Sequence, residues 1–92
     1  MYELTVYVPT KEHSKMLSNT HHAKFEKLVL SIFDNLTCKE TTRTCLSSDE
    51  QQTFLLYTIM VKSAGDGDKV DQIKQFTMSH YSDPALYFCY LA

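Results

Sequence analysis

A chain of 92 residues makes a single domain spanning residues 1–92, large enough to bury one modest core. Hydrophobic residues make up 43% and charged residues 22%, an ordinary globular composition that excludes a disordered chain. The formal net charge is −2 and the basic residues are scattered, so direct binding to nucleic acid through charge is not predicted.

The N-terminal segment, with Glu3 and Pro9, does not resemble a signal peptide. No segment approaches the ~20 apolar residues of a membrane span, so no membrane partner is expected. The three cysteines lack CxxC spacing, which favours reduced thiols. We therefore expect a cytoplasmic protein, in the host cytoplasm if a phage encodes it.

The first half of the chain predicts a strand, a helix and a second strand. Apolar and polar residues alternate over residues 2–9, as in a strand with one core face, and a polar loop follows over residues 11–19. From about residue 21 to a stop near Asn35, apolar residues recur at helical spacing. The threonine-rich segment 37–46 predicts a half-exposed edge strand guarded by charges.

The second half repeats the pattern. A polar turn over residues 47–52 leads into a third strand, 53–63, which should form a hairpin with the second. The glycine-containing segment 63–68 offers Asp66 or Asp68 as a helix cap, and a second helix runs to about residue 82. Residues 85–92 predict a fourth strand that is apolar on both faces.

The order βαββαβ predicts an α+β, ferredoxin-like fold: a four-stranded antiparallel sheet with two helices on one face and the first and third strands in the centre. The third strand then poses a question, because "TFLLYTIMVKS" is apolar on both sides. Tyr7, Phe54, Leu56 and Met60 should point away from the helices. An apolar patch of this kind typically marks a contact with a protein partner or a second copy of the chain; the alternative is a patch shielded by neighbouring polar side chains and loops.

No constellation predicts catalysis or a cofactor. His13, His21 and His22 are close in sequence, but adjacent helix residues point about 100° apart, so no metal site is predicted and a polar pair near the helix cap is favoured. His80, at the end of the second helix, has no paired carboxylate or nucleophile beside it in sequence. Cys89 is interpreted as a small buried hydrophobe.

The order of short patterns resembles a group of small, uncharacterised, ferredoxin-like bacterial and phage proteins. The patterns are "YELTVYVPT", "HAKFEKLVLSIFDNLT", "YTIMV" and "DPALYF", and together they cover most of the chain. Asp34 and Asn35 stand where that group has two glycines after the helix. The resemblance implies the fold and no activity. In size and style alone, the chain is also similar to phage anti-CRISPR inhibitors.

The leading hypothesis is a non-enzymatic binding protein, of the phage-encoded inhibitor type, that occupies a surface of a larger nucleic-acid-handling complex. Glu26, Asp34, Asp49 and Glu50 are candidate acidic contacts to basic surfaces of such a complex.

Two other hypotheses use the same open face. One is a small homodimeric enzyme in which two sheets enclose a pocket, with Tyr7, Tyr57, His80 or Tyr87 as polar groups in that pocket. The other is a structural homodimer.

Overall fold

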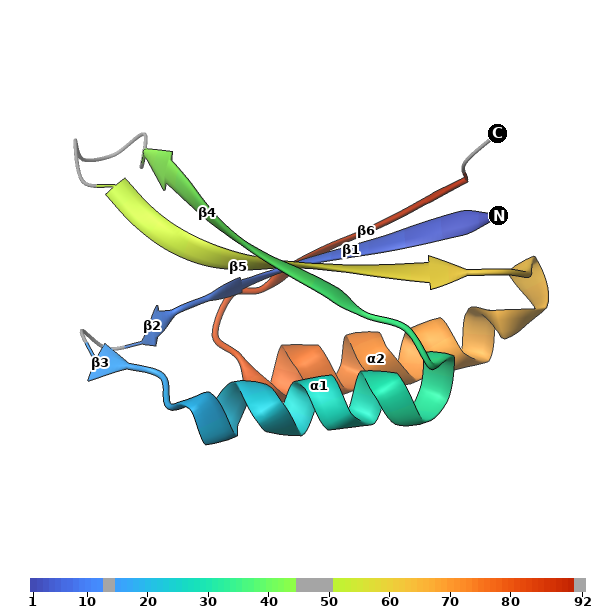
Figure 1. The fold of residues 1–92 in the computed structure, drawn as a ribbon, viewed down its shortest axis with the longest axis horizontal. Helices are drawn as coiled ribbons and strands as arrows, with labels where there is room; N and C mark the ends of the chain where they lie inside the picture. Colours follow the sequence, from blue (N-terminus) through green and yellow to red (C-terminus); the bar gives the residue numbers. More distant parts are fainter. Residues whose placement is uncertain (13–14, 45–50, 91–92) are drawn as a thin grey trace.

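The computed structural model describes residues 1–12, 15–44 and 51–90 and shows an α+β fold with both long helices on one side of a sheet (Figure 1). Its strands and helices are β1 (Tyr2–Pro9), β2 (Lys11–Glu12), β3 (Lys15–Met16), α1 (Asn19–Phe33), β4 (Thr37–Thr44), β5 (Gln51–Val61), α2 (Gly67–His80) and β6 (Ala85–Tyr90). A short 3₁₀ turn, Ala64–Asp66, precedes α2. No helix among the described residues is long and apolar enough to cross a membrane.

The main sheet has the strand order β4-β5-β1-β6, and every neighbouring pair is antiparallel. The two central strands, β1 and β5, are the first and third long strands of the chain, which confirms the predicted ferredoxin-like arrangement. The predicted hairpin of the second and third strands is also confirmed as β4 and β5.

The core lies between the sheet and the helices. Leu4, Val6 and Val8 of β1 are fully buried there beside Ile59 of β5 and Phe25 of α1. These strand positions alternate with side chains that face away from the helices, because successive side chains of a strand point to opposite faces. The core therefore uses one face of the sheet.

Capping residues set the limits of α1. At its start the Ser18 hydroxyl accepts a hydrogen bond from the His21 N–H at 3.1 Å. At its end Asp34 takes the left-handed conformation, with φ of 61°. Glycine adopts this conformation more readily than aspartate, and Asp34 stands at the first of the two positions where the resembling group has glycine.

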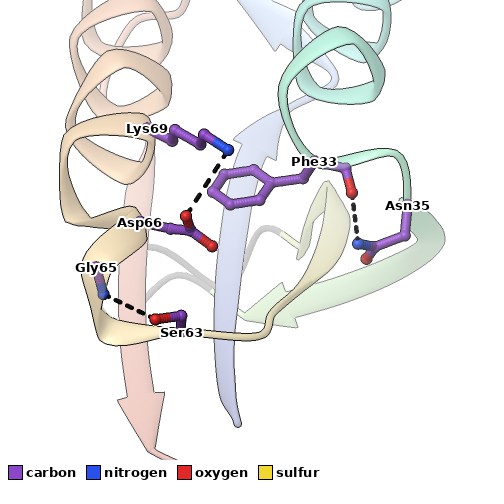
Figure 2. A network of polar contacts seen from close by, with 6 residues as sticks. All are labelled: Phe33, Asn35, Ser63, Gly65, Asp66 and Lys69. Atoms are coloured by element: carbon purple, nitrogen blue, oxygen red, sulfur yellow. Dashed lines mark hydrogen bonds and ion pairs between the residues drawn. The ribbon is translucent and has the colours of Figure 1, made fainter.

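Asn35 joins the end of α1 to the sheet. Its side-chain amide donates to the carbonyl oxygens of Phe33 and Met60, both at 3.0 Å, and its Oδ1 accepts from the Met60 N–H at 2.7 Å. Figure 2 shows the Asn35–Phe33 bond beside the start of α2, where Lys69 and Asp66 form an ion pair at 3.7 Å. Asp66 occupies the N-cap of α2, but its side chain makes no capping hydrogen bond.

The segment predicted as a polar loop over residues 11–19 contains an additional short hairpin. β2 pairs with β3, and the Leu17 N–H donates to the Thr10 carbonyl oxygen at 2.9 Å. Each strand is two residues long, so the segment is too short to show the alternating hydrophobic pattern that sequence analysis detects. The hairpin lies beside the start of α1 (Figure 1).

Candidate functional site: the open sheet face and the joined helix ends

The face of the sheet opposite the helices is lined largely by apolar and threonine side chains. The register pairs Tyr7 with Leu56 and Pro9 with Phe54, and it places Met60 beside Glu3. Directly paired residues share a face, so the four predicted residues lie on one surface, which we call the open face. All four are half-buried by their neighbours. Their use as a partner-binding surface stays a prediction.

The edge strand β6 extends this apolar surface. Ala85, Tyr87 and Cys89 pair with open-face positions of β1, whereas Leu86 and Phe88 pair with its core positions. Tyr87 is 52% exposed and contacts Tyr7 edge to face, with ring centroids 6.0 Å apart. The two tyrosines thus form an aromatic rim on the open face.

Cys89 corrects one prediction. It was expected to be a small buried hydrophobe, but it is exposed. Its strand lies at the edge of the sheet, so the apolar sequence around it does not imply burial on either face. On the helix side of the same strand Phe88 and Tyr90 are also exposed.

The opposite edge strand, β4, differs in chemistry. Its described side chains include Lys39 on the open face, paired with Leu56, and Glu40 on the helix side, paired with Leu55. Charged side chains on an edge strand disfavour pairing with another strand. The described residues of β6 include no charged side chain, so this edge lacks the charges that disfavour strand pairing at β4.

Two residues predicted for a pocket between paired sheets lie elsewhere. Tyr57 is fully buried on the helix side of β5, where its ring packs against Phe25 and its hydroxyl donates to Glu26 Oε2 at 3.1 Å. His80 lies in the helix layer. Tyr57 was placed incorrectly because it lies two positions from Ile59 in β5. Side chains two positions apart in a strand point to the same side, which here is the helix side. Of the four proposed residues, Tyr7 and Tyr87 lie on the open face.

The candidate acidic contacts are not grouped. Glu26 is half-buried and accepts the Tyr57 hydrogen bond. Asp34 is exposed at the end of α1. Asp49 and Glu50 lie outside the described residues. A role for these four carboxylates in binding stays a prediction.

The histidines join the start of α1 to the end of α2. The rings of His21 and His80 stack with centroids 3.8 Å apart. His21 Nε2 lies 2.8 Å from the His80 carbonyl oxygen, and His80 Nε2 lies 2.6 Å from the His21 carbonyl oxygen. Because a carbonyl oxygen can only accept, both Nε2 atoms carry a proton and donate. These two reciprocal bonds hold the helix ends together.

His22 makes a second, more deeply buried connection. Its exposed fraction is 8%, and its Nδ1 lies 2.7 Å from the hydroxyl oxygen of Tyr81, whose own exposed fraction is 3%. Burial raises the pKa of Tyr81, so this hydroxyl keeps its proton.

The structure replaces the sequence interpretation of a simple polar histidine pair. His22, Phe25 and Val29 are the buried residues of α1, a spacing of three and four that continues the core stripe by one turn. That spacing was the available signal for His22. The contact with His80 could not be inferred, because it depends on how the two helices align.

The described cysteines and acidic residues give no sign of nucleophilic or metal chemistry. Cys38 lies across from Tyr57 in the sheet, and burial is the main reason that the pKa of its thiol is raised, with the Tyr57 hydroxyl acting in the opposite direction. A raised pKa lowers the thiolate fraction of this exposed cysteine, and the thiolate is the reactive form. Among the described residues, no group of three His, Cys, Asp or Glu side chains could hold a metal ion; His13 lies outside them.

Comparison with known proteins identifies the fold but does not assign a function. No family model matches the sequence, and no curated protein matches it significantly. CutA1 from Pyrococcus horikoshii is similar in structure, with a TM-score of 0.69 and 13% identity over 99% of this chain and 83% of CutA1. A DUF3240 family protein from Shewanella baltica OS155 has a TM-score of 0.64 and 9% identity over 98% of this chain and 89% of that protein. Identities this low show a shared ferredoxin-like fold alone.

Proposed function

We propose that this chain is a protein-binding domain that acts through its open sheet face, and that a second copy of the chain occupies this face. The observation that carries the proposal is the apolar surface formed by Tyr7, Phe54, Leu56, Met60 and the exposed Tyr87. When one face of an antiparallel sheet remains in water, the side chains on that face are normally polar.

The charges of the face favour a second copy over a charged partner. The charged residues among its described side chains are Glu3 on β1, beside Met60, and Lys39 on β4, beside Leu56, so the described charges are one of each sign. Such a surface cannot select a strongly basic or acidic partner by electrostatic complementarity. It can pair with an identical surface, because most homo-oligomers use the same patch on both subunits.

The experiment is light scattering on the purified protein at several concentrations, with the variants Leu56→Glu and Leu30→Glu. Leu30 is exposed on α1, so its variant controls for the same change of side chain. We expect a dimer that Leu56→Glu dissociates and Leu30→Glu leaves intact, because a carboxylate at position 56 would lose its hydration in the interface.

A monomer at every concentration would refute the second copy as the occupant. It would leave the open face free for a foreign surface, as an inhibitor of a larger complex of the anti-CRISPR type requires. Dissociation by both variants would instead refute the assignment of the interface to the open face.

A further inference from the structure

A cleft of about 350 Å³ lies at the end of the molecule where α1 begins, away from the open face. Its walls come from residues of β2 and β3, the start of α1 and the helix side of β4 and β5. Small-molecule sites range over ~300–1,000 Å³, so this volume suits a small ligand. The apolar part of the wall includes Leu17, Leu55 and Met16.

The largely buried ring of His22 forms part of the wall of this cleft. His22 lines the cleft, and its Nδ1 is engaged by Tyr81. Its Nε2 has no hydrogen-bond partner among the described residues. Every enclosed side-chain nitrogen or oxygen among them has a partner. Nε2 is thus the ring nitrogen left to meet a ligand in the cleft that His22 lines.

The Tyr81 hydrogen bond sets which nitrogen carries the proton. The Tyr81 hydroxyl has no other acceptor among the described residues, so it satisfies its proton by donating to His22 Nδ1. Burial, followed by the charge of His21, lowers the pKa of His22, which favours the neutral ring. In a neutral ring whose Nδ1 accepts, the proton is on Nε2. His22 thus presents an N–H donor to the cleft.

Further donors lie beside it. Asn19, the first residue of α1, lines the cleft, and the backbone N–H groups of Asn19 and Thr20 have no acceptor among the described residues. The first turn of α1 has no acidic residue to oppose its positive end. Lys11 adds a cation to the wall, and Glu40 of β4 is the acidic residue of the lining.

We propose that this cleft binds a small carboxylate with an apolar body. The His22 Nε2–H donates to one carboxylate oxygen, with the start of α1 and Lys11 on the same anionic group, while the apolar body lies against Leu17 and Leu55. Donors to an ionised acceptor are stronger than donors to a neutral one, so an acid is preferred over its amide. The exposed Glu40 weakens the binding slightly through its charge. This site is independent of the open face.

Benzoate and its neutral analogue benzamide test the proposal by titration into the ¹⁵N-labelled protein, with affinity from calorimetry. We expect benzoate to bind at least about tenfold more tightly than benzamide. Benzoate should shift the Nε2 resonance of His22 more than those of His21 and His80. This readout uses the wild-type chain, so it does not depend on whether a variant folds.

Two variants sharpen the result. His22→Phe keeps a ring in the same place without the donor and should weaken benzoate about tenfold, whereas His21→Phe, a change in the adjacent residue, should leave the affinity within about threefold. Glu40→Gln should tighten benzoate modestly. The proposal is overturned if benzamide binds as well as benzoate, if neither binds at millimolar concentration, or if benzoate leaves the His22 resonances unmoved.

Discussion

Both faces of the sheet carry apolar side chains, but these side chains are covered to different extents on the two faces. On the helix side, the side chains of Leu4, Val6, Val8 and Ile59 are fully buried by α1 and α2. On the open face, Tyr7, Phe54, Leu56 and Met60 are half-buried by one another, and Tyr87 is half exposed. The apolar character of β5 on both sides therefore reflects two different contacts. One contact is inside the chain, and the other is proposed to come from a second copy.

The largest expected effect separates the two faces by placing a charge on each. Ile59→Glu buries an unpaired carboxylate in the core and should cost about 4 kcal/mol or more, enough to unfold a small domain. Leu56→Glu should keep the fold, because its side chain reaches solvent. Circular dichroism measures both. Equal unfolding of the two variants would show that the open face is as essential to the fold as the core.

A smaller effect compares one tyrosine from each region. Tyr81→Phe leaves His22 Nδ1 without its partner in a buried position and should lower the free energy of unfolding by about 1–3 kcal/mol. Tyr87→Phe makes the same change on the exposed rim and should alter the stability by less than about 0.5 kcal/mol. Urea unfolding at low protein concentration checks both. A similar loss for the two would remove the distinction between the helix layer and the open face.

Acid should destabilise the helix layer through His22. Its pKa is lowered, first by burial and then by His21 and His80, with Glu26 opposing, so the unfolded chain binds a proton more readily than the folded one. The free energy of unfolding is then highest above the ordinary histidine pKa of about 6.5, and it falls as the pH drops below that value. Unfolding measured between pH 7.5 and 5.5 should show this loss, and His22→Phe should reduce it. An unchanged pH dependence in that variant would contradict the assignment.

Thiol reactivity gives the smallest expected contrast between the two faces. In a Cys45→Ser background, Cys89 on the open side should react with a thiol reagent faster than Cys38, the pKa of whose thiol is raised by burial. Association through the open face should slow Cys89 as the protein concentration rises and leave Cys38 unchanged. Faster labelling of Cys38 than of Cys89 would reverse the contrast.

The fold could be predicted because each long element carries its own periodicity. The alternation in β1 and the three-and-four spacing in α1 are local signals, and the order of elements leaves few ways to pack them. The β2–β3 hairpin was missed because two-residue strands carry no period. The buried connection of His22 to Tyr81 was missed because the two residues are 59 positions apart and meet through the alignment of two helices. Burial of Cys89 was overpredicted because an apolar sequence does not reveal that its strand lies at an edge.

The most direct test of the central claim is the solvent accessibility of methyl groups, measured by NMR with a soluble paramagnetic probe at low and high protein concentration. Leu56 and Met60 report on the open face, and Leu30 and Met78, exposed on the helices, serve as matched controls. The account predicts that the methyl groups of Leu56 and Met60 become protected as the concentration rises, while those of Leu30 and Met78 stay accessible. Open-face methyl groups that remain equally accessible at every concentration would contradict it.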